Sequence, residues 1–460
     1  MVSVDNIIVD ICNRENNSNL FEIRIDGIPV YYYVRRYTRI EILKQHGHNF
    51  IVKHPPTKIW EHSKSVIKSI FKILKLLLSK KKYDNFIYSF GRLDKVNGLY
   101  MDKFTDPLID GSRIGEDYII FEPSRAWRHF TPRLHKDNVI YSDAIYWLGN
   151  NILKFYKKRY KKRNRNELNL LYEELVKTFP EVNYDKDSVV SILARNYLYH
   201  KFFHIILKKI KAKRLIAPSR TDFYHLIPVA KELNMKVFEL QHGIGYGEGI
   251  TGSGFHDALF MPDYFLSFGK VHSARCYGIS KDKIVEIGWA FNKYIQKLEK
   301  EMVDTLKEKV LVVSSPNISE KMVYITCMFA DKHPDIQFYF RPHPSEQLDE
   351  SRQMRLSSYT NITIDNNQEN VMVTIFRFDN IMGENSTVMY EALSMGKKVA
   401  KIRLDGLVPS YMTEEDKRSF YEITDDETFC DFIKSPLDAK PSRKLYTEFK
   451  PEVINRLLDD

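Results

Sequence analysis

The sequence predicts an α/β protein with two Rossmann-like domains, and three observations support this expectation. The chain has 460 residues, enough for two ordinary domains with a large buried core. Short apolar runs alternate with helical segments in both halves, as in parallel βαβ units. Several runs end in glycine, serine or histidine turns, where α/β sheets bind ligands. We expect an accessory β-rich extension at residues 1–60 and Rossmann-like domains at 61–290 and 291–460.

The first sixty residues do not resemble the start of a Rossmann domain. Residues 6–12 are mostly apolar and predict a strand. Two further strands are expected at 20–25 and 28–34, because they flank Asp26-Gly27, a strong signal for a two-residue hairpin. The extension is therefore predicted to be a β-hairpin layer.

Basic helices are expected after this extension. Residues 63–82 predict an amphipathic helix whose apolar residues recur at helical spacing and whose lysines flank them. Such a helix either packs on its own domain or lies on an anionic membrane surface, and both alternatives stay open. More helices are expected over 143–213, an inserted region in which residues 151–165 hold eight basic side chains and no acidic one.

Composition narrows the possible partners. The net charge is +10, which suits an acidic polymer or an anionic membrane surface. Nucleic acid is disfavoured because no recognised nucleic-acid module accompanies the basic runs. The four cysteines lack the spacing of a zinc site or a disulfide framework. No signal peptide is recognised at the N-terminus, so we expect a cytoplasmic protein that is peripheral at the inner face of the membrane.

A histidine turn follows one predicted strand of the N-terminal Rossmann-like domain. The strand at 237–240 runs into Gln241-His242-Gly243, and six of the 19 glycines lie between Gly243 and Gly254. Glycines let a backbone approach a ligand closely. A histidine at this position favours catalysis or phosphate contact, and the alternative is a histidine that only caps the strand.

Three polar turns are expected at strand ends in the second domain. Ser314-Ser315 follows the first strand, and Pro342-His343-Pro344 follows the strand at 337–341. A third turn, Glu384 to Thr387, leads into a helix for which Ser386 or Thr387 is the expected N-cap. The free amides and the dipole of this helix would favour a phosphate group.

The histidine–proline turn paired with the later serine–threonine turn resembles the GT-B glycosyltransferases of bacterial surface polysaccharides. This group includes sialyltransferases, polysialyltransferases, capsule Kdo transferases and CDP-glycerol glycerophosphotransferases. The resemblance covers the later part of the chain well and the first half weakly. It implies that His343, Ser386 and Thr387 hold the phosphate and ribose of a nucleotide donor, and that Glu391 binds ribose hydroxyls. It also implies an N-terminal acceptor domain, a C-terminal donor domain, and C-terminal helices that pack back.

Glycosyl transfer requires stabilisation of the departing phosphate, deprotonation of the acceptor and exclusion of water. Arg341, Ser314 and Ser315 are further expected donor contacts. Glu384 would repel a phosphate, so we expect it at the ribose, the base or a structural amide.

Three residues are candidates for the catalytic base. His242 is preferred, because the unperturbed pKa of histidine lies nearest working pH, and Glu248 and Asp106 are the alternatives. A retaining enzyme would need no such base, and His242 would then be an electrostatic or acceptor contact.

The resemblance thus implies a glycosyltransferase that moves a sugar from a CMP- or UDP-linked donor to a growing or lipid-linked surface polysaccharide. A DxD motif in a suitable loop is missing, so we expect no metal site and no cofactor besides the donor substrate. The alternatives are a CDP-glycerol-type glycerophosphotransferase, a GT-B-like UDP-sugar epimerase and a non-catalytic binding protein of polysaccharide assembly.

Overall fold

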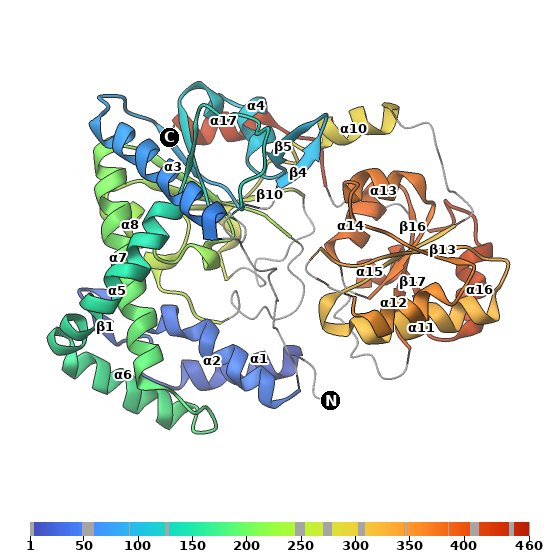
Figure 1. Cartoon of the computed structure of the whole chain (residues 1–460), viewed down its shortest axis with the longest axis horizontal. Helices are drawn as coiled ribbons and strands as arrows, with labels where there is room; N and C mark the ends of the chain where they lie inside the picture. Colours follow the sequence, from blue (N-terminus) through green and yellow to red (C-terminus); the bar gives the residue numbers. More distant parts are fainter. Residues whose placement is uncertain are drawn as a thin grey trace.

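Two parallel sheets, each flanked by helices, form two Rossmann-like domains, which confirms the predicted fold class (Figure 1). The computed structural model describes residues 4–47, 59–91, 93–124, 128–243, 254–269, 278–301, 309–344, 346, 348–384, 386–404, 414–440 and 446–459. Among these, no helix is both long and apolar enough to cross a membrane.

The N-terminal domain is built on a seven-stranded parallel sheet with the order β11-β10-β9-β8-β3-β6-β7. Its strands are β3 (Asn85–Tyr88), β6 (Tyr118–Glu122), β7 (Val139–Tyr141), β8 (Arg214–Pro218), β9 (Lys236–Leu240), β10 (Tyr264–Ser267) and β11 (Ile284–Glu286). The strand order reverses between β3 and β8, and such reversals are the usual ligand sites of open α/β sheets.

Helices cover this sheet, and the predicted basic insertion between β7 and β8 is helical. The long helices are α3 (Ile59–Leu78), α5 (Asp143–Arg163), α6 (Arg165–Thr178) and α7 (Lys186–Ile210). The short elements are β4 (Leu93–Val96), β5 (Leu99–Asp102), α4 (Asp106–Gly111), α8 (Ile227–Glu232), and the 3₁₀ turns η1 (Arg113–Glu116), η2 (Arg220–Asp222), η3 (Ala258–Phe260) and η4 (Lys281–Lys283).

The N-terminal extension is helical, so the predicted β-rich layer is wrong. Helices α1 (Val4–Asn16) and α2 (Tyr31–Gln45) replace the strands expected at 6–12 and in most of 28–34. The buried Ile7, Ile8 and Ile11 of α1 fit helical spacing as well as an apolar strand, and burial selected the helix.

The hairpin at Asp26-Gly27 is present but short. It joins β1 (Arg24–Ile25) to β2 (Ile28–Pro29), with antiparallel pairing. Asp26 has φ 51° and Gly27 has φ 81°, so both central residues take the positive φ that a tight two-residue hairpin requires.

The C-terminal domain has a six-stranded parallel sheet with the order β14-β13-β12-β15-β16-β17. Its strands are β12 (Val310–Val313), β13 (Phe338–Arg341), β14 (Ile362–Ile364), β15 (Asn380–Gly383), β16 (Lys398–Ile402) and β17 (Tyr421–Ile423). This order reverses between β12 and β15, which places the Ser314-Ser315 turn beside the Glu384–Thr387 turn.

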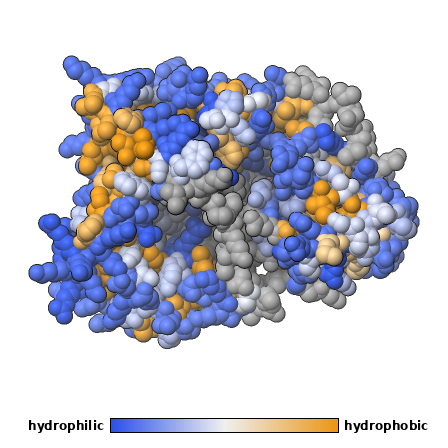
Figure 2. Space-filling model, viewed as in Figure 1, coloured by the Kyte–Doolittle hydropathy of each residue, from blue (hydrophilic) through white to orange (hydrophobic). Residues whose placement is uncertain are grey.

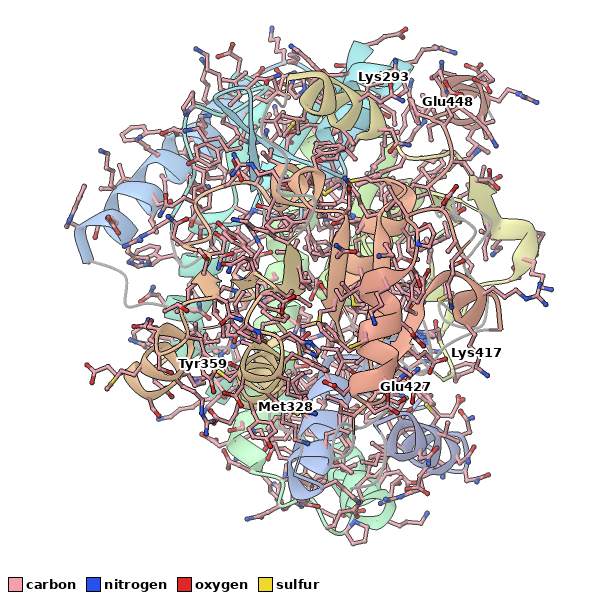
Figure 3. All side chains as sticks on the ribbon, turned by 90° about the vertical axis from the view of Figure 1, so that its right-hand side faces the viewer. Lys293, Met328, Tyr359, Lys417, Glu427 and Glu448 are labelled. Carbon is pink, nitrogen blue, oxygen red and sulfur yellow. The ribbon has the colours of Figure 1, made fainter. Side chains whose placement is uncertain are left out.

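Short helices flank this second sheet. They are η5 (Pro316–Ile318), α11 (Ser319–Lys332), α12 (Glu350–Ser357), α13 (Val371–Arg377), α14 (Thr387–Ser394), α15 (Glu414–Ser419) and α16 (Asp426–Lys434). Helix α10 (Asn292–Glu301) contacts α13, and its Tyr294 donates to Asp110 of α4 at 2.5 Å. In Figure 3, Met328 on α11 and Glu427 on α16 mark the outer face of this domain, turned toward the viewer.

The C-terminal segment returns to the N-terminal domain, as the resemblance implied. Thr447 donates its amide to the Phe268 carbonyl at 2.8 Å, and α17 (Pro451–Asp459) lies against η1 through an Arg113–Asp459 ion pair of 2.8 Å. Gly288 has φ +72°, and a Cβ there would lie 1.9 Å from the Glu448 carbonyl oxygen. Only glycine therefore fits this contact.

Candidate interdomain site

The carboxyl ends of the two sheets meet at what we call the interdomain site. Gly243 follows β9 of the N-terminal domain, and a Cβ built on it would lie 4.0 Å from the Thr387 Oγ1 of the C-terminal domain. The His242 turn and the Ser386-Thr387 turn are thus neighbours in space, although they are far apart in the sequence. The structure brings together the two turns that sequence reasoning singled out in separate domains.

Ser386 is the N-cap of α14, as predicted. Its hydroxyl accepts a hydrogen bond from the Val388 amide at 3.3 Å, and its φ of −116° is extended. Thr387 is the first helical residue, so the other expected cap position is not used. The side chain of Thr387 points to the other domain, at the positive end of the helix dipole, where an anion is favoured.

Glu391 is one helical turn further along α14 and joins the two domains. Its Oε1 accepts from the Lys103 Nζ at 2.9 Å, and the Glu391 side chain is buried. Burial lowers the pKa of Lys103, but attraction to Glu391 and Asp94 outweighs it, so the lysine pKa is raised. The buried Oε2 has no hydrogen-bond partner among the described residues, which leaves an acceptor for a ligand hydroxyl.

Lys103 was not predicted from the sequence. It follows β5 in a polar loop, 288 positions before its partner, and no local pattern relates it to the second domain.

A carboxylate that sequence reasoning missed organises the His343 turn. Glu346 accepts from the His343 amide at 3.0 Å and from the Ser314 hydroxyl at 3.0 Å, and it also accepts from the Ser319 hydroxyl. Glu346 thereby ties the turn after β13 to the turn after β12. Ser314 is fully buried and donates its hydroxyl to this carboxylate. Ser315 is the N-cap residue of η5.

Arg341, expected from the sequence as a donor contact, is held by partners inside its own domain. Its buried guanidinium pairs with Asp365 and donates to the Thr374 hydroxyl at 2.7 Å and to the Glu369 carbonyl at 2.7 Å. All of these partners lie inside the C-terminal domain. Through them the Arg341 guanidinium holds β13 against the segment before α13. A phosphate would have to displace a buried carboxylate to reach it.

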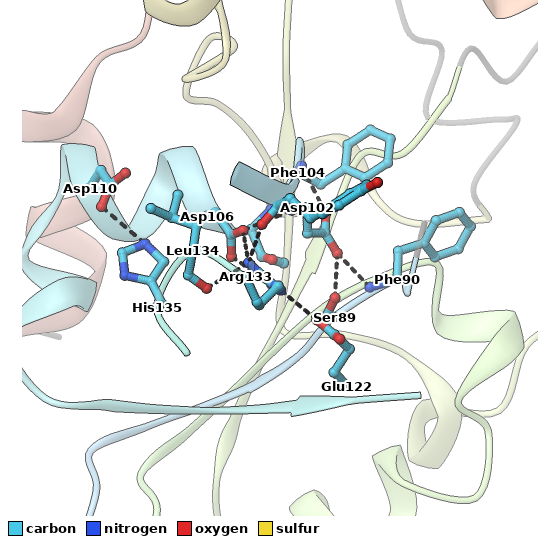
Figure 4. Close-up of polar contacts among 12 residues, drawn as sticks. Ser89, Phe90, Asp102, Phe104, Asp106, Asp110, Glu122, Arg133, Leu134 and His135 are labelled. Carbon is cyan, nitrogen blue, oxygen red and sulfur yellow. Dashed lines mark hydrogen bonds and ion pairs between the residues drawn. The ribbon is translucent and has the colours of Figure 1, made fainter. Parts of the chain in front are cut away.

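Asp106, an alternative candidate for the base, is bound by an arginine and a backbone amide. It lies at the start of α4, is fully buried, and accepts from the Asp102 amide at 2.7 Å. Both of its oxygens bind the guanidinium of Arg133, which also reaches Glu122 at 2.7 Å (Figure 4). Burial raises the pKa of Asp106 to about 7 although Arg133 opposes the shift. An acceptor hydroxyl could not contact this carboxylate without breaking the network.

His242 is held at the end of β9 by its neighbour. The buried Gln241 donates to the Gly243 carbonyl at 3.0 Å and accepts from the Phe268 amide at 2.7 Å, which fixes the turn against β10. The His242 ring lies 5.4 Å from the Phe90 ring, between centroids. Glu248, the second candidate for the base, falls outside the described residues.

Glu384 lies half-buried at the end of β15. Burial raises the pKa of its carboxyl group, and Lys401 and Arg403 oppose that shift. Its contact to the ribose, the base or a structural amide stays a prediction.

A cluster of three potential metal ligands lies elsewhere in the described part of the chain. Atoms of His333, Asp426 and Cys430 come within 4.8 Å of one another. The same Asp426 carboxylate pairs with Lys332 at 3.5 Å. The cluster lies at the end of α11 and on α16, on the side of the C-terminal domain away from the N-terminal one (Figure 1). It contributes nothing to the interdomain site.

Comparison with known proteins finds distant structural likeness only. No protein-family model and no curated protein matches the chain. UDP-GlcNAc 2-epimerase from Methanocaldococcus jannaschii aligns over 82% of this chain and 98% of its own, with 12% identity and a TM-score of 0.45. The wall teichoic acid polymerase TagF, soaked with CDPG, aligns over 88% and 98%, with 12% identity and a TM-score of 0.43. We argue no activity from similarities at this level.

Proposed function

We propose that this protein is a GT-B-type glycosyltransferase that moves a sugar from a CMP- or UDP-linked donor to a growing or lipid-linked surface polysaccharide. The observation that carries the proposal is the proximity of Gly243 to Thr387, since a Cβ built on Gly243 would lie 4.0 Å from the Thr387 Oγ1. It sets a histidine turn of one Rossmann-like domain opposite a helix N-terminus of the other. A donor held by the second domain would then present its reactive carbon to the first.

The donor would bind at the reversal between β12 and β15. The amides of α14 and the Thr387 hydroxyl would stabilise the departing phosphate, with His343 at the neighbouring strand end. The unpartnered oxygen of Glu391 would accept a ribose hydroxyl. These contacts supply charge stabilisation by helix amides and side chains, and the proposal needs no metal site.

His242 would remove the proton of the acceptor hydroxyl as it attacks the donor's anomeric carbon. The carbon–oxygen bond to the phosphate breaks, and the electron pair leaves with the nucleotide. A CDP-glycerol-type glycerophosphotransferase would use the same turns, whereas its acceptor would attack phosphorus. A UDP-sugar epimerase would need no acceptor, and the basic, apolar outer face described below favours an enzyme that works on a polymer or a lipid-linked chain.

The nucleotide site predicts a selective loss of affinity when its hydroxyls are removed. Ser386→Ala with Thr387→Ala should weaken binding of the preferred nucleotide at least about tenfold, because the phosphate loses a hydroxyl and the helix start loses its cap, worth about 1 kcal/mol. A thermal-shift screen of CMP, CDP, UDP and GDP identifies the nucleotide, and calorimetry then measures both proteins.

Asp425→Ala is the matched control, since Asp425 caps α16 behind β17, two strands from β15. It removes a cap but should leave nucleotide affinity unchanged. If all four nucleotides fail to bind the wild type, the transferase proposal is lost. Equal affinity of the wild type and the double variant would reduce Ser386 and Thr387 to structural residues.

We also propose that the outer face of α3 and α5 attaches the protein to the inner, anionic face of the cytoplasmic membrane. Phe71 and Leu78 on α3 and Phe155 on α5 are 68%, 84% and 84% exposed, respectively. Apolar residues gather over this side of the N-terminal domain in Figure 2. Exposed lysines of α3 border the same stripe, namely Lys64, Lys68 and Lys75. Charge and exposed apolar area together suit an interfacial helix.

Membrane attachment predicts salt-sensitive sedimentation with anionic vesicles. Changing Lys64, Lys68 and Lys75 to Gln should weaken binding at least about tenfold, at about 1 kcal/mol per lysine. Lys72 is left in place, because its Nζ donates to the Val139 carbonyl at 2.6 Å and burial lowers its pKa. Phe71→Ser, which removes exposed apolar area from α3, should also weaken binding, and Met354→Ser, at an exposed site on α12, is its control. Equal sedimentation with neutral and anionic vesicles would leave α3 without this role.

A further inference from the structure

A pocket of about 670 Å³ opens in the N-terminal domain at the reversal between β3 and β8. Phe90 lines it after β3 and Phe223 after β8, while Tyr146 of α5 and Arg195 of α7 close it from the helical insertion. Its volume falls in the range of small-molecule sites. Ligands of open α/β sheets bind at such a reversal, and none of the donor contacts proposed above uses this one.

Arg195 is a half-buried cation in the wall of this pocket. Its Nε is buried, and no residue that the structure describes accepts a hydrogen bond from it. A partly buried guanidinium group without a hydrogen-bond acceptor lowers the stability of the fold. A carboxylate or phosphate can accept hydrogen bonds from two of its N–H groups at once. Arg195 is therefore poised for an anionic group.

The remaining walls suit a ring that carries hydroxyl groups. The Tyr146 and Tyr199 rings meet edge to face with centroids 4.8 Å apart, which presents aromatic surface to the pocket. His225 is only 6% exposed, and its Nε2 has no hydrogen-bond partner among the described residues. Burial and the neighbouring His200 lower the pKa of His225 to about 3, so its ring is neutral and can exchange a hydrogen bond with a ligand hydroxyl.

The pocket adjoins the residue proposed as the catalytic base. Phe90 lines the pocket and its ring centroid lies 5.4 Å from that of His242. Asp222 lies at the rim of the pocket, and its negative charge is compensated by Arg36 at 3.3 Å. It also accepts a hydrogen bond from the Ser219 hydroxyl at 2.9 Å, so its repulsion of a bound anion is reduced. The Phe90 ring thus separates the pocket from the His242 ring.

We propose that this pocket holds an acidic sugar unit of the acceptor, with its carboxylate or phosphate on Arg195 and its ring against the tyrosines. This inference rests on the proposed transferase function and gives its acceptor a chemical class. A neighbouring unit of the same acceptor, beyond Phe90, would then offer its hydroxyl to His242.

The test measures binding of simple sugars to the full chain by ligand-observed NMR and calorimetry. Methyl glucuronide and glucose 6-phosphate carry the two kinds of anion, and methyl glucoside is the neutral reference. At least one acidic sugar should bind about tenfold or more tightly than methyl glucoside, and the stronger of the two identifies the anion. Arg195→Gln should remove this preference, Arg195→Lys should retain part of it, and Lys208→Gln, an exposed charge on the same helix, should leave it intact.

Equal binding of acidic and neutral sugars by the wild type would overturn the inference, and this comparison requires no variant to fold. So would an acidic preference that survives in folded Arg195→Gln. Displacement of the acidic sugar by the nucleotide, with loss of both in the Ser386/Thr387 variant, would assign the anion to the donor site instead. If nucleotides bind while acidic sugars do not, the pocket assignment fails and the transferase proposal stands. If acidic sugars bind while nucleotides do not, the transferase and the acceptor role of the pocket are both rejected, and only a site for acidic sugars remains.

Discussion

Replacing Glu15 by alanine is expected to lower the free energy of unfolding by about 3–5 kcal/mol. Glu15 is fully buried between α1 and α2, where Arg35 and Arg39 reach it at 2.7 and 2.6 Å. The substitution leaves two buried guanidinium groups without their shared carboxylate. Urea unfolding measures the change, and Glu41→Ala is the control, because its Lys44 partner is at the surface and such a pair contributes about 0–1 kcal/mol.

The stability that Glu15 contributes should decrease as the pH falls. Burial raises the pKa of Glu15, but Arg35 and Arg39 outweigh it, so the folded-state pKa is below the ordinary value of 4.5. A carboxyl group with a lowered pKa stabilises the fold above its unfolded pKa and loses that contribution as pH falls through the folded pKa. The stability difference between wild type and Glu15→Gln should therefore be full at pH 7 and shrink below about pH 4.5. A difference that stays constant over this range would contradict the ion-pair account.

Arg35 of the Glu15 cluster also contacts the chain at Gly254 and Phe255. Arg35 donates to the Phe255 carbonyl at 3.0 Å, and a Cβ on Gly254, which has φ +84°, would lie 2.6 Å from its guanidinium. The helical extension thus anchors the chain close behind the glycine-rich stretch that begins at Gly243. Loss of Glu15 should reduce turnover as well as stability, because this anchor loosens.

Short sequence patterns predicted the strands, the helices between them and the turns at the strand ends. The alternation of strands and helices gave both sheets, and the Asp26-Gly27 pair gave a hairpin, although a two-residue one. The turns at His242, His343 and Ser386 could be found because each follows an apolar strand with residues suited to a helix start or tight turn. Helix α1 was missed because its apolar spacing fits two secondary structures, and only its packing decides between them.

Partnerships between distant residues were beyond such patterns. Arg341 stands at a strand end like a phosphate ligand, yet Asp365 neutralises it inside the domain. Glu346 and Lys103 shape the site through contacts that depend on how strands and domains come together. A charged residue at a strand end therefore predicts a site only when its tertiary partners are known.

Replacing His242 by alanine is expected to lower turnover at least about 100-fold, the low end for general base catalysis. His242 ends β9 beside Gly243, which faces Thr387, so it would stand on the acceptor side of the donor's anomeric carbon. Donor affinity should change little, because the proposed phosphate contacts belong to the other domain. Turnover of the wild type should also fall on the acid side of its pH profile, where the imidazole becomes protonated.

Two variants separate proton transfer from positioning. His242→Asn keeps hydrogen-bonding groups but cannot take a proton, so it should be as slow as His242→Ala and lose the acid limb of the profile. His204→Ala, a partly exposed histidine on α7, should leave both rate and profile unchanged. If His242→Ala retains turnover, or loses nucleotide affinity as strongly as His343→Ala does, then His242 is not the base. Glu248 would be tested next, since Arg133 and the Asp102 amide already occupy the Asp106 carboxylate.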